Sequence, residues 1–541
     1  MNGSGLNENV LLYNEPNITI ILIVGSFLLL LNLVGYALDR FFYCGLVGQI
    51  FLGVAWGIPG AKWLSLSMQE SVGELGYLGL ILLVYEGGLS SDIRAIRSNL
   101  LMSSLSALTG VLATIGISFI LMVLVDASPL QAFAAGAALS STSLGTTFTL
   151  LKNSGLISSH SGVIIASAAV LDDVTGLIMA QVISKLGSDS TFNAVTVIRP
   201  VFVSIAFAVG VPTICCLLIK PTAKRLRACY ALLPINIISN LQFSFVVHTT
   251  ILIGFVVASS YAGTSNLFGA YIAGACIRWY DSDITTEELL SSNVVSADGI
   301  DLTQYTIPLN NNLNHILRSR VAETTQSNAV IEGMSCKLVA LECPSPVLLK
   351  NQDNKFINEK KKRNFKHDGI NDSKYLGADD GEYFQSTDDI VTGKGTWDTF
   401  YEKPVSLILK PFFFSSIGFS IPISQMFDGS TVWRGLVFSV MMVLAKLLCG
   451  IWLVRFCYIK NLSCFSNSNN QLQTFPRIKS LYPAILVGSA MVARGEIGFL
   501  VAAIAQSRGI FTPEQFLVVI WSIVLCTIIG PIAVGFLSRK A

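Results

Sequence analysis

Five ionisable residues stand inside stretches of the chain that are otherwise apolar. Asp172 and Asp173 are adjacent in AAVLDDVTGL, Lys446 lies in MMVLAKLLCG, and Arg494 and Glu496 lie in AMVARGEIGFL. A charge at the centre of a lipid bilayer costs about 2.5 kcal/mol or more, so such residues are rare there and mark the pathways of ions or substrates. We therefore interpret these five residues as candidate functional residues.

The two aspartates cannot have the same partner. Adjacent residues on a helix point about 100° apart. One aspartate can pair with a cation from another helix, for which Lys446 is the natural candidate, because an unpaired ammonium in hydrocarbon is untenable. The other can face a water-filled cavity, where a carboxylic acid holds its proton to near neutral pH and can exchange it for a monovalent cation. A site that binds either ion, and never both, is sufficient for exchange, although a purely structural ion-pair cluster is the competing interpretation.

Two polar segments interrupt apolar runs. Both segments are rich in Ser, Thr or Gly. Polar side chains of this kind compete for the hydrogen bonds of the helix backbone, so both segments favour interrupted helices. Paired interrupted segments in the two halves of a chain indicate the site of a transporter with inverted repeats, whereas ordinary packing through small residues would give a similar pattern. The predicted discontinuous-helix site consists of Ser140, Ser141, Thr142, Ser143, Arg494 and Glu496.

The composition indicates a membrane protein that crosses the bilayer many times. Of 541 residues, 52% are hydrophobic and only 13% are charged, against about 25% charged residues in soluble domains. The net charge of +2 provides no electrostatic footprint for nucleic acid. About thirteen apolar stretches approach the roughly 20 residues that a spanning helix needs. They are Ile18–Leu38, Gly45–Ile58, Gly73–Leu89, Leu100–Val125, Leu130–Leu151, Ser161–Lys185, Val201–Ile219, Leu241–Tyr261, Leu267–Ile277, Val405–Ile421, Val432–Cys457, Tyr482–Ala505 and Phe516–Leu537.

These stretches divide the chain into three parts. Residues 1–278 hold nine helices: a first repeat, a linker helix and the start of a second repeat. Residues 279–403 are polar and are predicted to form a mostly disordered cytoplasmic loop. Residues 404–541 hold the last four helices, and GGLSSDI at 87–93 and IGFSIPI at 417–423 are a faint internal echo of two repeats. Lys and Arg concentrate in alternate short loops, which predicts that the N-terminus is outside and the C-terminus cytoplasmic.

The order of these motifs resembles the monovalent cation:proton antiporter superfamily. The motifs are LILLVYEGGLSSD, ALSSTSLGTTFTLL, SAAVLDDVTGLIM, PFFFSSIGFSI, VLAKLLCG and ARGEIGFLVA. The Asp-Asp pair with a membrane lysine is similar to the electrogenic two-aspartate sodium/proton antiporters of that superfamily. The resemblance implies an all-α protein with two inverted six-helix repeats, two crossed discontinuous helices, an elevator-like movement and a homodimer. By this resemblance Asp172 and Asp173 together form the shared site for the cation and the proton. Asp173 binds the ion, sodium as the metal, and Asp172 pairs with Lys446 so that this pair carries part of the proton; Glu86 matches an acidic family position only loosely.

The expected function is therefore transport and not enzymatic catalysis. We expect an antiporter that exchanges sodium or lithium for protons, acts in pH homeostasis, needs no cofactor beyond the transported ions, and contacts membrane lipid in the plasma membrane or an endomembrane. A potassium/proton antiporter, and a channel or transport-dead sensor, are the alternatives. An intramembrane aspartyl protease would need two aspartates on different helices, and here the pair is adjacent.

Overall fold

The computed structural model describes most of the chain outside the long polar segment. The described residues are 15–42, 44–91, 99–143, 160–186, 194–214, 241–297, 392–452 and 481–538, with residues 145, 147, 148, 151 and 217. The chain divides into two compact units, one of Met1–Leu289 with Asp389–Ala541 and one of Leu290–Asp388. The helices discussed below belong to the first unit, except for the last turns of α13.

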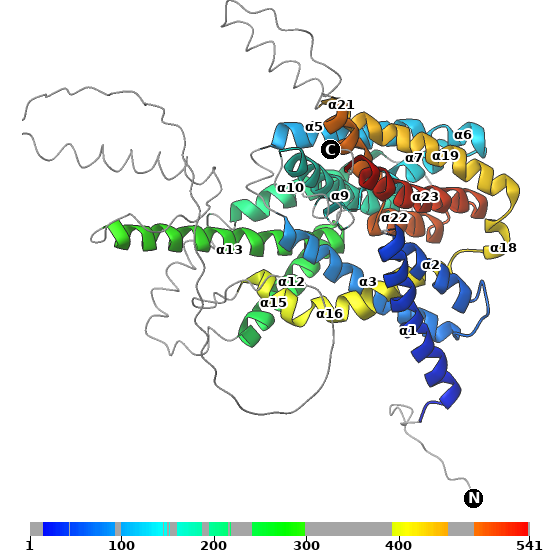
Figure 1. The fold of residues 1–541 in the computed structure, drawn as a ribbon, viewed down its shortest axis with the longest axis horizontal. Coiled ribbons are helices and arrows are strands. Elements are labelled where there is room, and N and C mark those ends of the chain that lie inside the picture. The colour runs from blue at the N-terminus through cyan, green and yellow to red at the C-terminus, as the bar shows by residue number, and fades with distance from the viewer. Residues whose placement is uncertain are drawn as a thin grey trace, which may run out of the picture. The chain divides into compact units, whose positions relative to one another are not determined.

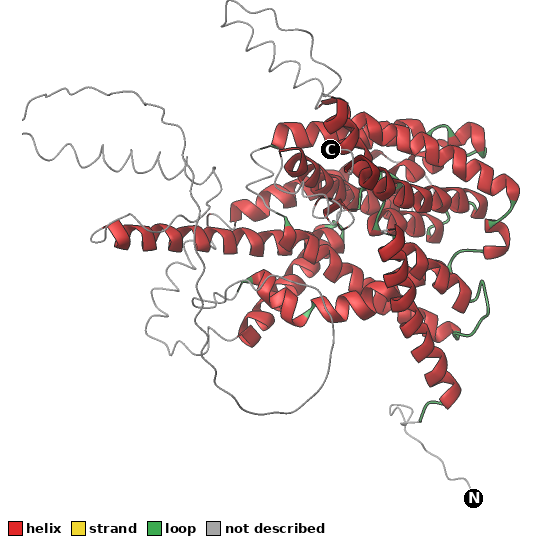
Figure 2. Cartoon of the chain, in the orientation of Figure 1, coloured by secondary structure: helices red, strands yellow, loops and turns green. Residues whose placement is uncertain are grey.

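The described residues form helices joined by loops and include no strand (Figure 2). Within them, seven helices are long and apolar enough to cross a membrane. The prediction of an all-α polytopic membrane protein is thus confirmed, whereas the count of about thirteen spans stays a prediction. The seven are α1 (Ile18–Phe42), α3 (Leu66–Ser90), α5 (Leu100–Ser118) with α6 (Leu121–Leu124), α9 (His160–Leu186), α12 (Leu241–Ala262), α19 (Gly429–Leu447) and α23 (Pro513–Ser538).

Two predicted spans are broken into half-helices. α7 (Pro129–Ala138) begins with a capping box between Ser128 and Gln131, and it ends where the Ser/Thr-rich segment starts. α21 (Leu481–Ala490) and α22 (Glu496–Ser507) are separated by a short segment that is not helical. The breaks coincide with the two polar segments of the sequence, because their small and hydroxyl-bearing residues do not favour a continuous helix.

Six helices pack around these breaks. α5 contacts α7, α9 and α19, while α22 contacts α7, α9 and α23, and α19 lies along α23. Figure 1 shows these helices gathered on one side of the first unit. A second set, α1, α2 (Gly45–Trp56), α3 and α17 (Lys410–Phe419), packs through its own contacts. The remaining described helices include α10 (Ala194–Ile214) and α18 (Ile423–Met426).

The helix that ends in α17 begins well before the predicted span at Val405. α15 (Gly393–Phe400), α16 (Glu402–Pro404) and a π-helical turn (Val405–Leu409) precede it. Pro411 has no amide to donate to the carbonyl of Leu407, which leaves that carbonyl free. The amide group of Asn32 on α1 donates to it at 2.9 Å, so α1 stabilises the interruption.

Both ends of the segment 279–403, which is predicted to be a loop, include helical residues in the structure. α13 continues from Asn266 to Ala297, far beyond the predicted end of its span at Ile277, and α15 starts at Gly393. Residues 298–391 lie outside the described part of the chain. Polar composition suggested a loop at 393–403, but α15 buries Trp397 and Thr396 against its neighbours, which makes this segment part of the helical assembly.

Candidate functional site

The two predicted aspartates lie in the middle of α9, and α19 brings a lysine to the first. Nζ of Lys446 lies 2.5 Å from Oδ2 of Asp172, and both side chains are fully buried. The hydroxyl of Thr142 donates a 2.7 Å hydrogen bond to the same oxygen. Nζ of Lys446 also donates to Oγ1 of Thr142 at 3.3 Å. Additional hydrogen bonds of this kind offset part of the cost of removing an ion pair from water.

α5 leaves space for this lysine at a glycine. A Cβ on Gly110 would lie 3.2 Å from Nζ of Lys446 and 2.6 Å from Sγ of Cys449. A larger residue would therefore displace the ammonium or the thiol. Gly110 was missed in the sequence because a glycine among small residues is common in packed membrane helices.

Asp173 has different surroundings from its neighbour, as the rotation along a helix requires. The residue is only 7% exposed, and within the described part of the chain it accepts no hydrogen bond and has no ion-pair partner. Its strongest interaction with another charged group is repulsion by Glu496, followed by repulsion from Asp172. A buried carboxylate without an ion-pair partner binds an added cation or proton favourably.

The two helix interruptions cross beside the aspartates. Residues 141–143 and 493–495 are both non-helical. The amide of Ser143 donates a 2.9 Å hydrogen bond to the carbonyl of Ala493, and the hydroxyl of Thr142 reaches the carbonyl of Met491 at 3.3 Å. Buried backbone groups need partners, so each interruption satisfies free backbone groups of the other.

Arg494 lies near the C-terminus of one half-helix, and Glu496 lies at the N-terminus of another. Arg494 is fully buried, and its Nη1 donates to the carbonyl of Ser141 at 3.1 Å, just beyond the C-terminus of α7. Glu496 is half-buried and is the first residue of α22. A cation near a helix C-terminus and an anion near an N-terminus both interact favourably with the helix dipole. The two residues are thus placed to compensate the ends of the half-helices electrostatically.

The four predicted hydroxyl residues contribute differently. The hydroxyl of Ser140 donates back to the carbonyl of Ala137 in α7 at 2.8 Å. Oγ of Ser141 has no hydrogen-bond partner among the described residues, and Ser143 provides the backbone amide that joins the two breaks. In the described part of the chain, Thr142 is the one of the four whose side chain contacts the ion pair.

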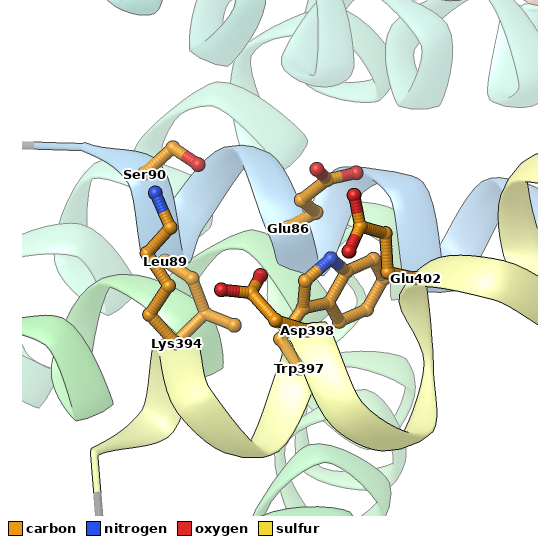
Figure 3. Close-up of a pocket in the computed structure, with 7 residues that line it drawn as sticks. All are labelled: Glu86, Leu89, Ser90, Lys394, Trp397, Asp398 and Glu402. Atoms are coloured by element: carbon orange, nitrogen blue, oxygen red, sulfur yellow. The ribbon is translucent and has the colours of Figure 1, made fainter. Parts of the chain in front are cut away.

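A second group of charged side chains lines a pocket between α3 and α15–α16 (Figure 3). The pocket has a volume of about 310 Å³. Figure 3 shows the carboxylates of Glu86, Asp398 and Glu402 around the indole of Trp397, whose Nε1 is buried and has no partner among the described residues. We call this the acidic pocket; its lining residues are Glu86, Leu89, Ser90, Lys394, Trp397, Asp398 and Glu402.

Glu86 connects the acidic pocket with the aspartates electrostatically. Its carboxylate is attracted by Lys410 and repelled by Glu402 and by Glu496. Glu496 in turn is the charged group that acts most strongly on Asp173. The carboxylate of Glu496 thus interacts electrostatically with both Glu86 and Asp173.

The sequence reasoning missed Asp398 and Glu402 because it placed them in a disordered loop. Two signals could have found α15. Thr392 is a favourable N-cap residue, and its hydroxyl accepts a hydrogen bond from the amide of Gly395. Trp397 and Tyr401 are four residues apart, which places two aromatic rings on one helix face.

The described residues hold no group of three or more His, Cys, Asp or Glu side chains arranged to hold a metal ion.

Comparison with known proteins identifies the family. A family model described as the transmembrane sodium/hydrogen exchanger matches residues 20–296 and 394–540. The high-affinity Na(+)/H(+) antiporter NhaS3 of Synechocystis sp. is 32% identical over 167 residues, which cover 30% of this chain and 36% of the relative. The probable Na(+)/H(+) antiporter GerT of Bacillus cereus is 27% identical over 236 residues, which cover 43% and 58%. The matched segments thus span about a third to somewhat over half of these relatives.

A solved structure agrees at the level of the fold. The sodium proton antiporter MjNhaP1 from Methanocaldococcus jannaschii aligns with a TM-score of 0.51 and 13% identity, over 96% of this chain and 99% of that chain. The resemblance to the monovalent cation:proton antiporter superfamily is confirmed by the family model, which covers most of the chain. The chain belongs to the transmembrane sodium/hydrogen exchanger family.

Proposed function

We propose that the chain is a secondary active antiporter that exchanges sodium for protons at Asp173. One observation carries the proposal: of two adjacent buried carboxylates, Asp172 is already neutralised by Lys446 at 2.5 Å, whereas Asp173 has no cationic partner among the described residues. A buried charge without a partner is unfavourable. Asp173 is therefore neutralised either by a proton or by a sodium ion.

Competition for one carboxylate couples the two fluxes. A sodium ion that binds Asp173 displaces the proton, and a proton that binds displaces the ion. Neither ion crosses without the other moving in the opposite direction, provided that the empty, charged carboxylate does not cross the membrane. The low polarity around a residue that is 7% exposed makes that crossing unfavourable.

The crossing of the two breaks serves alternating access. Transporters built on discontinuous helices bind their ions where the half-helices meet, and one bundle then moves against another. Here the contact between Ser143 and Ala493 ties the breaks to each other, and the bond from Thr142 to Asp172 ties them to α9. The ion site and the breaks therefore move as one body, as in an elevator.

The acidic pocket is the entry route from one side of the membrane. The carboxylates of Asp398 and Glu402 attract cations, and Glu86 and Glu496 continue the series of negative charges toward Asp173. Surfaces lined by one sign of charge raise the local concentration of oppositely charged ions. With the N-terminus outside, the end of α3 at Ser90 lies on the cytoplasmic side, so this route opens to the cytoplasm.

Sodium is the proposed cation because the relatives named above are sodium/proton antiporters. The proposal includes a homodimer and lipid contact. Apolar side chains on α12, such as Phe243, Val246 and Ile253, are about half exposed and suit contact with lipid or with a second copy.

The test is transport by the purified protein in vesicles with an imposed pH gradient and a pH-sensitive dye. Sodium, lithium and potassium are added in turn. We expect sodium and lithium to dissipate the pH gradient. The concentrations of sodium and lithium that give half-maximal exchange should be lower than that of potassium. Current that flows without movement of protons would contradict the proposal and indicate a channel, and no flux with any cation would indicate a transport-dead sensor.

A further inference from the structure

Two segments that are far apart in the sequence meet at the edge of the acidic pocket. The amide of Gly393, the first residue of α15, donates a 2.7 Å hydrogen bond to Oδ2 of Asp281 on α13. The two residues are 112 positions apart. Asp281 also lies four residues beyond the predicted end of the span at Ile277, outside the membrane-spanning part of α13. We call this hydrogen bond the clasp.

The contact around the clasp is close. A Cβ on Gly393 would lie 2.4 Å from Cγ2 of Ile277 and 3.1 Å from Oδ2 of Asp281, and a further contact of 3.3 Å would form with Leu89 at the end of α3. The start of α15 is therefore pressed against α13 and α3. A carboxylate at a helix N-terminus is favourable because the first amides of a helix have no partner within it.

The clasp determines where α15 places its other side chains. Trp397 stacks on Tyr401 with ring centroids 5.3 Å apart, and it packs against Tyr85 of α3 at 5.9 Å. Asp398 follows directly in the sequence and Glu402 lies one turn later; both line the acidic pocket, and the carboxylate of Glu402 lies beside that of Glu86 (Figure 3). Movement of the start of α15 would thus shift two carboxylates relative to Glu86.

We infer that Asp281 is a positioning residue for cation entry: it holds α15 against α13, so that the carboxylates of α15 and α16 lie beside Glu86. The inference rests on the proposed function, because it assigns the acidic pocket to the entry of the transported cation. Asp281 itself does not contact the ion.

The charge environment of Asp281 makes the stability of this arrangement depend on pH. Arg278 on the same helix attracts its carboxylate, Tyr85 on α3 interacts with it, and the amide of Gly393 faces it from α15. Burial nevertheless raises the pKa of Asp281 to about 6. A group whose pKa is raised in the closed arrangement stabilises that arrangement below its ordinary pKa and loses this contribution as the pH rises through 6. The packed arrangement that buries Asp281 is therefore most stable in acid and loses stability toward neutral pH, whereas the hydrogen bond from Gly393 by itself favours the ionised carboxylate.

Two substitutions separate the hydrogen bond from the charge. Asp281→Asn retains an oxygen that accepts from Gly393 but cannot ionise, so its clasp stays closed at every pH. Asp281→Ala removes the acceptor, so its clasp is open at every pH. Asp428→Asn is the matched control, because Asp428 is an exposed aspartate at the N-terminus of another helix, α19.

The experiment measures hydrogen–deuterium exchange of the α15 amides and the half-saturating sodium concentration of the full chain, for all four proteins at matched pH. Protons compete with sodium in all four proteins. The ratio of each variant's half-saturating sodium concentration to that of the wild type therefore reports the effect of the clasp alone. Asp281→Asn is expected to match the wild type at pH 4 or below, where both side chains are neutral. At pH 7 it should show better-protected α15 amides and a half-saturating concentration lower by up to about a hundredfold, since the equilibrium changes by a factor of ten for each of the roughly two units by which burial raises the pKa of Asp281.

Asp281→Ala is expected to show poorly protected α15 amides and raised half-saturation at both pH values, and Asp428→Asn to match the wild type. Identical pH dependence of wild type and Asp281→Asn, in both measurements, would overturn the inference while the exchange activity stands. Absence of exchange in the wild type would instead remove the proposed function, and the protection of α15 would still test the clasp.

Discussion

Gly495 lies against Ser143 at the point where the two interrupted helices cross. A Cβ on Gly495 would be 2.9 Å from both Cβ and Oγ of Ser143, closer than real Cβ atoms approach other atoms. The same crossing carries the hydrogen bond from Ser143 to Ala493. The position therefore requires a residue without a side chain.

Replacing this glycine by alanine should loosen the crossing. We expect Gly495→Ala to lower the free energy of unfolding by about 1–3 kcal/mol, the usual cost of overpacking, and to slow exchange. Thermal unfolding in detergent and initial transport rates measure both effects. Gly116→Ala on α5 is the control, because nothing lies within 4 Å of a Cβ at that position. A Gly495→Ala protein with wild-type melting temperature and rate would show that the contact is not limiting.

Lys446→Ala should be strongly destabilising. Removal of the ammonium leaves Asp172 buried without its counter-charge, a change that costs about 3–5 kcal/mol when one partner of a buried pair is lost. The double variant Asp172→Asn/Lys446→Ala should recover part of this loss, since no unpaired charge remains. The melting temperatures of both single variants and the double variant give the coupling energy. Purely additive effects, or an unchanged melting temperature and voltage response in Lys446→Ala, would argue against the pair.

Glu402→Gln should weaken cation capture without changing the ion site. We expect the half-saturating sodium concentration to rise roughly two- to fivefold at low ionic strength, and the difference to shrink in high salt, because screening weakens attraction by exposed charges. Glu74→Gln is the control, an exposed acid on α3 outside the acidic pocket. The maximal exchange rate should stay the same. Equal half-saturation for Glu402→Gln and the control at every salt concentration would dismiss the pocket as an entry route.

The raised pKa of Asp281 predicts that the free energy of unfolding depends on pH. Burial raises its pKa from an ordinary 3.8 to about 6, so its contribution to stability is complete below about pH 4 and is lost as the pH rises through 6. Asp281→Asn cannot ionise and should be more stable than the wild type at pH 8, by at most about 3 kcal/mol, and equally stable at pH 4. Melting temperatures across this pH range test the prediction. A difference that is larger at pH 4 than at pH 8 would have the wrong sign.

The main charged residues of the site could be found from the sequence because placing a charge in an apolar span costs a large free energy. Asp172, Asp173 and Lys446 are conspicuous in runs of apolar residues, and an ammonium there needs a carboxylate partner. The structure places Lys446 on Asp172. Only the resemblance predicted that Asp172, and not Asp173, pairs with Lys446. The rotation along a helix shows that the two aspartates point in different directions, but it does not show which of them faces α19.

Other features depend on contacts between distant segments. Pro411 predicts an interruption, but the amide of Asn32 that satisfies it comes from another helix. The helical form of α15 was hidden by its polar composition, because its stability comes from packing Trp397 against Tyr85 and Tyr401. Such tertiary contacts override local composition.

The most direct measurement is the number of protons released when sodium binds to the purified protein. Calorimetric titration in two buffers with different ionisation enthalpies gives this number for the wild type and for Asp173→Asn. We expect about one proton released per sodium bound by the wild type at a pH where the site is protonated, and neither heat of binding nor proton release in Asp173→Asn. Sodium binding without proton release in the wild type, or undiminished release in Asp173→Asn, would contradict the shared site.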